Sequence, residues 1–249
     1  MQRVLEPETL DHLAPDDPAA QRSRRDLRRV NRVMGAPAIL ARAIERVRPS
    51  VAPGRALRVL ELGCGDGRLM LDVARRSRHW PKVEIDLLDR QPLVDTTTVA
   101  AYAAVGWRAR PLEADVLDWA GGAIDGGPWD LIVANLFLHH FEGAALARLL
   151  AGCAARADAL VACEPRRSRF ALAASHLVVF IGANAVTRED AVLSVRAGFR
   201  AGELSAAWPV GPGWRLDEFD DGLFTHCLCA ARQASAGAAH LRADAGPGA

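Results

Sequence analysis

The residues with the clearest chemical potential form a glycine-rich turn in the segment VLELGCGDGRL. Gly63, Gly65 and Gly67 let the backbone turn tightly and approach a ligand with no Cβ in the way. Glu61 precedes these glycines and Asp66 lies among them. The strand pattern before the turn and the helix pattern after it predict a nucleotide-type site at the carboxyl edge of a parallel sheet.

The spacing and charge of this turn indicate which nucleotide it suits. A dinucleotide-binding turn has the spacing G-x-G-x-x-G, and Arg68 stands where the third glycine is needed. That kind of turn also holds a pyrophosphate at a helix N-terminus, where Glu61 and Asp66 would repel it. The sequence therefore disfavours a nicotinamide cofactor and favours a cationic or zwitterionic ligand without phosphate.

The arrangement E-x-G-x-G-x-G resembles motif I of the class I S-adenosylmethionine-dependent methyltransferases. The motif-level resemblance covers residues 57–141, and beyond them only the order of the elements is similar. It implies S-adenosyl-L-methionine as cofactor and S-adenosyl-L-homocysteine as product. It implies that the cofactor's amino group meets Glu61 or a backbone carbonyl nearby. It also implies that the methionine portion lies against the turn residues Gly63, Cys64, Gly65 and Gly67.

Polar residues recur at the ends of the next predicted strands. Asp89 ends the second strand, Asp115 follows the third and Asn135 ends the fourth. In a doubly wound sheet, ligand contacts come from successive strand ends at the switch point. A carboxylate at Asp89 can accept both ribose hydroxyls of an adenosyl group, because it offers two acceptor oxygens.

The resemblance assigns the remaining parts of the cofactor to the same strand ends. It implies that Asp115 accepts the adenine amino group, with Val116 against the ring. It places Asn135 beside the methionine portion. Arg90 and Leu136, which adjoin these positions in the chain, are expected in the cofactor site as well.

Two adjacent histidines are the candidate catalytic residues. His139 and His140 follow the fourth predicted strand, beside the expected position of the methyl group. Methyl transfer from a sulfonium mainly needs positioning and a dry site, and a histidine base helps when the acceptor is a hydroxyl. Leu-His-His is frequent after this strand in the family, so one histidine alternatively braces the following helix. His140 is slightly preferred as the base, and no metal site is expected.

Alternating strand and helix patterns predict how these residues are positioned. Strands are predicted over residues 57–62, 83–88, 107–113, 129–134 and 159–163, and helices over 68–76, 92–105 and 142–155. Two helices, 168–181 and 187–197, follow, the second opened by Thr187 and Asp190 as a capping box. Two strands, 199–208 and 222–231, complete the pattern.

The predicted fold class is α/β, with a Rossmann-like, doubly wound, seven-stranded methyltransferase sheet. Residues 1–50, with helices over 19–33 and 38–47, form an N-terminal helical lid. Residues 51–232 form the methyltransferase domain, and the helical insert before strand six, about 165–198, is expected to cap the acceptor. Residues 233–249 are expected to be a disordered tail.

The lid and the insert bear on the acceptor. The basic lid helix presents either a solvated face or residues that touch cofactor or acceptor, namely Arg29, Asn31 or Arg32. Arg166, Arg167 and Arg169 could hold an acidic group on the substrate. His176 is expected to be a core histidine rather than a second base. Either a wall for a hydrophobic acceptor or ordinary core packing explains the apolar residues of the insert. These are Phe170, Leu172, Leu177, Val178, Val179, Phe180 and Ile181.

Composition narrows the class of partner. A formal net charge of +1 gives no electrostatic argument for nucleic acid or a membrane surface. Asn135 does not begin the (N/D)-P-P-(F/Y/W) loop typical of N-methyltransferases acting on adenine or glutamine, which argues against nucleic-acid and protein amide substrates. Five scattered cysteines, a polar N-terminus and no membrane span predict a cytoplasmic protein. A monomer or homodimer with a small-molecule acceptor is expected.

The sequence therefore predicts a methyltransferase for a small, hydrophobic acceptor. O-methylation of a phenolic or polyketide-type natural product is the first choice, and C-methylation of a quinone-like ring is the alternative. A non-catalytic S-adenosylmethionine-binding protein and a nicotinamide-dependent oxidoreductase are the rival classes.

Overall fold

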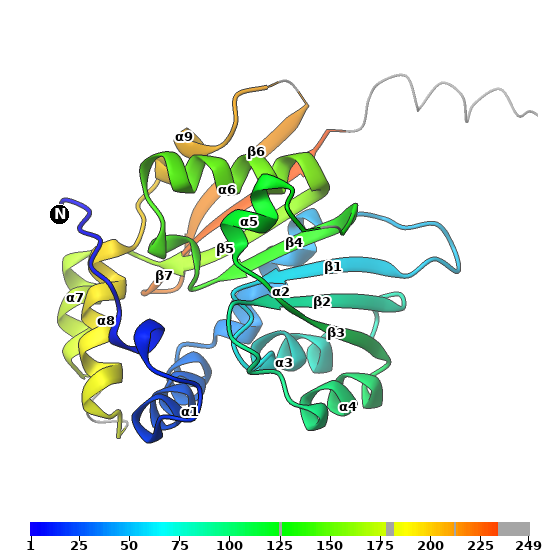
Figure 1. The fold of residues 1–249 in the computed structure, drawn as a ribbon. Helices are drawn as coiled ribbons and strands as arrows, with labels where there is room; N and C mark the ends of the chain where they lie inside the picture. Colours follow the sequence, from blue (N-terminus) through cyan, green and yellow to red (C-terminus); the bar gives the residue numbers. More distant parts are fainter. Residues whose placement is uncertain (125, 178–181, 212, 234–249) are drawn as a thin grey trace, which may run out of the picture.

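A seven-stranded sheet with strand order β3-β2-β1-β4-β5-β7-β6 forms the centre of the molecule (Figure 1). The structure is a computed structural model that describes residues 1–124, 126–177, 182–211 and 213–233. Its strands are β1 (Leu57–Leu62), β2 (Val83–Asp89), β3 (Trp107–Glu113), β4 (Trp129–Asn135), β5 (Ala157–Pro165), β6 (Trp214–Asp221) and β7 (Thr225–Arg232). The strands from β1 to β5 pair in parallel, whereas β7 is antiparallel to both of its neighbours. The predicted α/β sheet is confirmed.

Helices cover both faces of the sheet. The α-helices are α1 (Pro18–Val33), α2 (Ala36–Val47), α3 (Arg68–Arg76), α4 (Thr96–Ala104), α5 (Val116–Gly121), α6 (Gly143–Arg156), α7 (Arg169–Ser175), α8 (Ala185–Ala197) and α9 (Glu203–Ala207). The short 3-10 helices are η1 (Thr9–His12) and η2 (Leu138–His140). None of the helices in the described part of the chain combines the length and apolar character needed to cross a membrane.

Two apolar cores follow from the alternation of side chains along the strands. Val59 packs with residues of α2, α3 and α4 on one face, and Leu60 packs with residues of α5, α6 and α9 on the other. Burial on both faces explains the nearly continuous apolar sequence of β1 and β4. The order reverses between β1 and β4, so their carboxyl ends flank the switch point where ligands bind in such sheets.

The prediction of a strand over 199–208 was wrong. The helix α9 lies there, with Gly202 at its N-cap in the left-handed region at φ 86°. The sixth strand, β6, lies instead between the two segments that were predicted to be strands. As an edge strand β6 carries half-buried acids that pair with α2, Asp217 with Arg46 at 2.6 Å and Asp221 with Arg42 at 2.8 Å. These acids interrupt the apolar pattern by which a strand is recognised in a sequence.

The capping box predicted at Thr187 was also wrong. Asn184 caps α8 by accepting the backbone N–H of Thr187 at 2.8 Å, so the helix begins earlier than expected. Asp190 instead accepts the backbone N–H groups of Thr9 and Leu10, at 2.8 and 3.1 Å. This second contact ties the N-terminal segment to the insert.

The helix α1 lies beside the insert rather than on the sheet (Figure 1). Buried Asp26 accepts the N–H of Asn184 at 2.9 Å, and buried Ser23 donates to the side-chain oxygen of Asn184 at 3.1 Å. The N-terminal segment and α8 are therefore joined by buried polar contacts. Residues 234–249 of the tail expected over 233–249, and Val178, Val179, Phe180 and Ile181, lie outside the described residues.

Candidate active site

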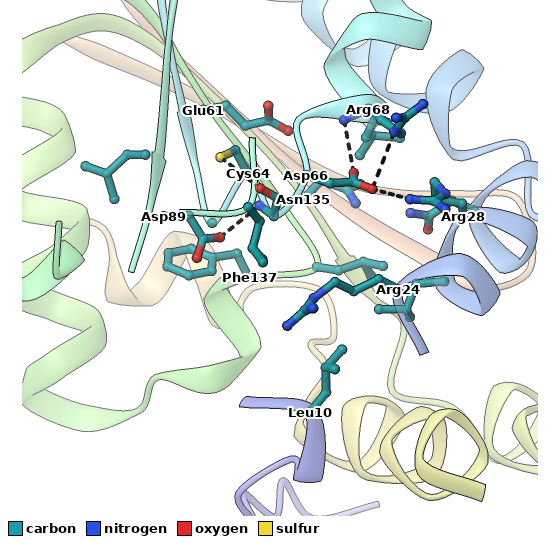
Figure 2. Close-up of a pocket in the computed structure, with 18 of the residues that line it drawn as sticks. Leu10, Arg24, Arg28, Glu61, Cys64, Asp66, Arg68, Asp89, Asn135 and Phe137 are labelled. Carbon is teal, nitrogen blue, oxygen red and sulfur yellow. Dashed lines mark hydrogen bonds and ion pairs between the residues drawn. The ribbon is translucent and has the colours of Figure 1, made fainter. Parts of the chain in front are cut away.

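A cavity of about 940 Å³ lies at the carboxyl ends of the first four strands, opposite residues of η1 and α1 (Figure 2). The structure brings nearly all of the predicted cofactor residues to it. They are Glu61, Gly63, Cys64, Gly65, Asp89, Arg90, Asp115, Val116, Asn135 and Leu136. Gly67 does not line the cavity and instead forms the N-cap of α3 at φ 70°. Both candidate catalytic histidines, His139 and His140, line it.

The glycine turn is bound to the end of the neighbouring strand. The N–H of Gly65 donates to Oδ2 of Asp89 at 2.8 Å (Figure 2), and Oδ1 of Asp89 accepts the N–H of Gln91 at 2.9 Å. A Cβ built on Gly65 meets nothing within 4 Å, so the cavity is open above this residue. Below the turn, the buried hydroxyl of Tyr102 donates to the carbonyl of Gly67 at 2.7 Å.

Gly63 permits a close approach of the next loop. It has φ 63°, and a Cβ there would lie 2.1 Å from Cδ2 of Phe137. The ring of Phe137 therefore rests directly on the glycine turn, at the boundary between the strand ends of β1 and β4. A side chain at position 63 would displace this ring.

Glu61 tests whether the cavity suits the expected cofactor. Its side chain is 3% exposed, and its Oε2 atom has no hydrogen-bond partner among the described residues. Burial, reinforced by the charges of Asp66 and Asp89, raises the pKa of this carboxyl well above its usual value. A buried acceptor without a partner is costly. The ammonium of an amino-acid ligand would supply the missing donor, so the residues fit S-adenosylmethionine.

The adenine end of the expected site is less enclosed. Asp115 is exposed and its Oδ1 caps α5 by accepting the N–H of Leu117 at 2.7 Å. This short helix was not predicted. Val116 is buried and contributes both to the core and to the cavity. An adenine ring could thus lie against Val116 with the second oxygen of Asp115 facing it.

The loop after β4 has an unusual backbone. Leu136 has φ 51°, a left-handed conformation that costs a non-glycine residue on the order of 1–2 kcal/mol. Its N–H donates to the carbonyl of Cys163 at 2.9 Å. The next N–H groups, of Phe137 and Leu138, donate to the carboxylate of Glu164 at 3.1 and 2.9 Å. Glu164, at the end of β5, therefore fixes the loop that carries both histidines.

His139 lies between two carboxylates. Its Nδ1 atom is 2.8 Å from Oε2 of Glu164, and its Nε2 atom is 3.3 Å from Oε1 of Glu8. Burial lowers the pKa of this imidazole, but the two carboxylates outweigh it and raise the pKa from 6.5 to about 9. At neutral pH His139 is consequently protonated and poorly suited to accept a proton.

His140 has the opposite environment. It is half-buried, and burial together with the charge of His139 lowers its pKa. Its Nδ1 atom is 3.3 Å from Oδ2 of Asp11. His140 is therefore the histidine of the pair that is neutral at neutral pH and available as a base.

Three groups lie close enough to share a cation. Ligand atoms of Glu8, His139 and His140 lie within 4.8 Å of one another. Both ring nitrogens of His139 already face carboxylates, so a cation would have to separate His139 from Glu8. The arrangement is better explained as an ion pair within the protein than as a metal centre.

The helix α1 contributes polar residues to the other side of the cavity. Arg28 forms an ion pair with Asp66 of the glycine turn (Figure 2), and Arg24 donates to Oε1 of Gln91 at 3.0 Å. Arg32 also lines the cavity. So does Asn31, whose buried Oδ1 has no partner among the described residues. Arg29 does not line it and pairs with Asp26.

The insert contributes less than expected. Arg166 pairs with Asp220 at 2.9 Å and buried Arg167 pairs with Glu203, both away from the cavity. Phe170 is 57% exposed and does not line the cavity, so it forms no acceptor wall. His176 is exposed rather than part of the core. The insert residues at the cavity that the structure describes reduce to Ser194 of α8.

Sequence reasoning missed Glu8, Asp11 and Glu164. A signal for Glu164 was present, because it continues the series of polar residues at strand ends beyond the fourth strand. Glu8 and Asp11 carried no such signal. They reach the histidines only through the fold of the N-terminal segment.

Comparisons with known proteins agree with this geometry. Residues 59–157 match the family model described as a methyltransferase domain. Curated proteins provide no match to the chain. An O-methyltransferase family protein from Burkholderia thailandensis is 17% identical with a TM-score of 0.57, covering 88% of this chain and 61% of that one.

Two further solved structures are similar. The plantazolicin methyltransferase BpumL in complex with SAH is 10% identical with a TM-score of 0.60, covering 88% of this chain and 92% of that one. The pyocyanin biosynthetic protein PhzM is 19% identical with a TM-score of 0.52, covering 88% and 60%. The chain thus spans about three fifths of the length of two of the three structures. At these identities the likeness shows the fold alone.

Proposed function

We propose that this chain, a class I S-adenosylmethionine-dependent methyltransferase, methylates a hydroxyl oxygen of a small, apolar acceptor of phenolic or polyketide type. The observation that supports the acceptor chemistry best is the position of His140. This half-buried imidazole lines the same cavity as Glu61, Asp89 and Asp115, and its pKa is lowered. A neutral histidine beside the cofactor cavity suits a reaction that removes a hydroxyl proton.

The strand ends are proposed to bind and orient the cofactor. Glu61 receives the ammonium, Asp89 receives the ribose hydroxyls, and Asp115 with Val116 holds the adenine. When bound, S-adenosylmethionine supplies an electrophilic methyl group on a sulfonium sulfur. Positioning supplies most of the catalysis in such an in-line displacement, since the acceptor oxygen need only be held close and aligned.

His140 is proposed to take the acceptor proton. Asp11, close to Nδ1 of His140, favours the tautomer in which Nδ1 carries the hydrogen and Nε2 is the free base. As the oxygen–methyl bond forms and the methyl–sulfur bond breaks, Nε2 would accept the hydroxyl proton and later release it to solvent. The charge of His139 helps, because it keeps His140 neutral before the reaction.

The surroundings of the histidines support an apolar acceptor. Leu10, Leu136, Phe137 and Phe141 line the cavity near this end. Such side chains exclude water and pack against a ring. Within the expected lid of residues 1–50, the part that precedes α2 is accordingly proposed to cover the acceptor, whereas α2 packs on the sheet.

A transfer assay tests the proposal. The chain is incubated with S-adenosylmethionine labelled in the methyl group and with a panel of substituted phenols and hydroquinones, and the products are identified by mass spectrometry. A methyl ether is expected, with His140→Ala slower by at least about 100-fold at pH 7. His176→Ala is the control, because His176 is exposed and away from the cavity. A ring-methylated product, or turnover that ignores the loss of His140 at every pH, would contradict the hydroxyl chemistry.

A further inference from the structure

The carboxylate of Glu164, at the end of β5, is held in place by hydrogen bonds to the loop after β4. Its carboxylate is fully buried and accepts backbone N–H groups of Phe137, Leu138 and His139 at distances of 2.9 to 3.3 Å. The remaining partner is the imidazole of His139 at 2.8 Å. A buried carboxylate that loses its cationic partner is strongly destabilising. The position of His139 is therefore fixed from the sheet side.

Glu8 reaches the other nitrogen of the same imidazole from the N-terminal segment. Its carboxylate is 3.3 Å from Nε2 of His139 and also accepts the hydroxyl of Ser194 in α8. Two residues along, Leu10 lines the cavity, and its N–H is held by Asp190 of α8. The segment that contains η1 is therefore held between α8 and the histidine pair.

From this geometry we propose that Glu8, His139 and Glu164 are positioning residues that form a charged clamp across the acceptor end of the cavity. The imidazolium of His139, shared by the two carboxylates, holds η1 closed over the cavity. The same contacts fix η2, so that His140 faces the acceptor. The catalytic role of the clamp rests on the proposed methyl transfer, whereas the closure can be measured without turnover.

Charge makes the clamp sensitive to pH. The ionisable groups that face His139 or the segment docked on it are Arg3, Glu8, Asp11, His140, Glu164 and Asp190. Carboxylates predominate among them, so the protonated form of His139 is favoured. Its pKa of about 9 means that the clamp is intact at neutral pH and loses its central charge above pH 9. Arg3, which donates to the carbonyl of His139 at 3.2 Å, adds a contact that does not depend on this titration.

Hydrogen–deuterium exchange of residues 1–17 tests the clamp. The protein is saturated with S-adenosylhomocysteine, and Glu8→Gln is compared with wild type at pH 7, with rates corrected for intrinsic exchange. Glu8→Gln is expected to exchange about tenfold faster in this segment, because it loses a charge-assisted contact worth about 1.5 kcal/mol. Glu6→Gln is the matched control, since Glu6 is exposed and two residues away.

Above pH 9, residues 1–17 of the wild type are expected to exchange as fast as those of Glu8→Gln. The affinities of Glu8→Gln and Glu6→Gln for S-adenosylhomocysteine are expected to stay within about twofold of wild type. Once an acceptor is identified, the Glu8→Gln variant should show a higher KM for that acceptor and an unchanged KM for S-adenosylmethionine. Unchanged protection in Glu8→Gln, or protection independent of pH between 7 and 10, would overturn the clamp. Either result would leave methyl transfer itself untouched, because the readout does not require it.

Discussion

Replacing Glu61 by glutamine is expected to stabilise the ligand-free protein and to weaken cofactor binding. The pKa of Glu61 in the folded chain lies well above 4.5, because the carboxyl is buried beside Asp66 and Asp89. An acid with a raised folded pKa stabilises the folded state fully below its unfolded pKa, and this contribution is lost as pH rises through the folded pKa. Glutamine does not ionise, so the variant has no charge to bury at pH 7. Its unfolding temperature should therefore exceed that of wild type.

The loss of affinity follows from the proposed ammonium contact. A hydrogen bond between charged groups contributes about 1.5–3 kcal/mol, which corresponds to about 10–150-fold in Kd. The ammonium favours ionised Glu61, so any proton that the raised pKa keeps on Glu61 should be released on binding. Calorimetry in buffers of different ionisation enthalpy measures that proton directly.

Two ligands separate this contact from a general effect. Titration calorimetry with S-adenosylhomocysteine should show the loss in Glu61→Gln, whereas 5′-methylthioadenosine, which lacks the amino acid, should bind both proteins equally. Glu113→Gln is the control, as this exposed acid ends β3 without lining the cavity. Equal losses for the two ligands, or a variant less stable than wild type, would refute the reasoning.

Three further outcomes are expected. Asp89→Ala removes the acceptor for the N–H of Gly65 and for the ribose, and calorimetry should show S-adenosylhomocysteine binding weakened by at least about tenfold. The rise in the pKa of His139 from 6.5 to about 9 contributes about 3 kcal/mol of stability below pH 6.5 that disappears as pH rises through 9. Urea unfolding should show that decline in wild type and not in His139→Gln. Gly63→Ala pushes a Cβ into Phe137 and strains a positive φ, so it should cost about 1–3 kcal/mol in the same assay.

Much of the sheet was predictable because local pattern and tertiary burial agree there. The segments of β1, α3 and β3 were predicted with the bounds that the structure gives. The edge strand β6 was not, because its sequence carries acids that pair with arginines of α2 and interrupt the apolar pattern of a strand. There, tertiary pairing overrides a sequence pattern that resembles a loop.

The candidate site, too, has a part that the sequence predicts and a part that it does not. The convergence of Glu61, Asp89 and Asp115 was predictable, since parallel strand ends meet at one edge whatever the rest of the chain does. The difference between His139 and His140 was not. It depends on Glu8, which lies 131 residues away in the chain, and on which ring faces Glu164.

A crystal structure grown with S-adenosylhomocysteine tests the central claim most directly. The account predicts the adenine against Val116 and Asp115, the ribose on Asp89, and the amino group on Glu61, with the sulfur directed toward His140. Ligand density elsewhere on the molecule, or an amino group pointing away from Glu61, would contradict it.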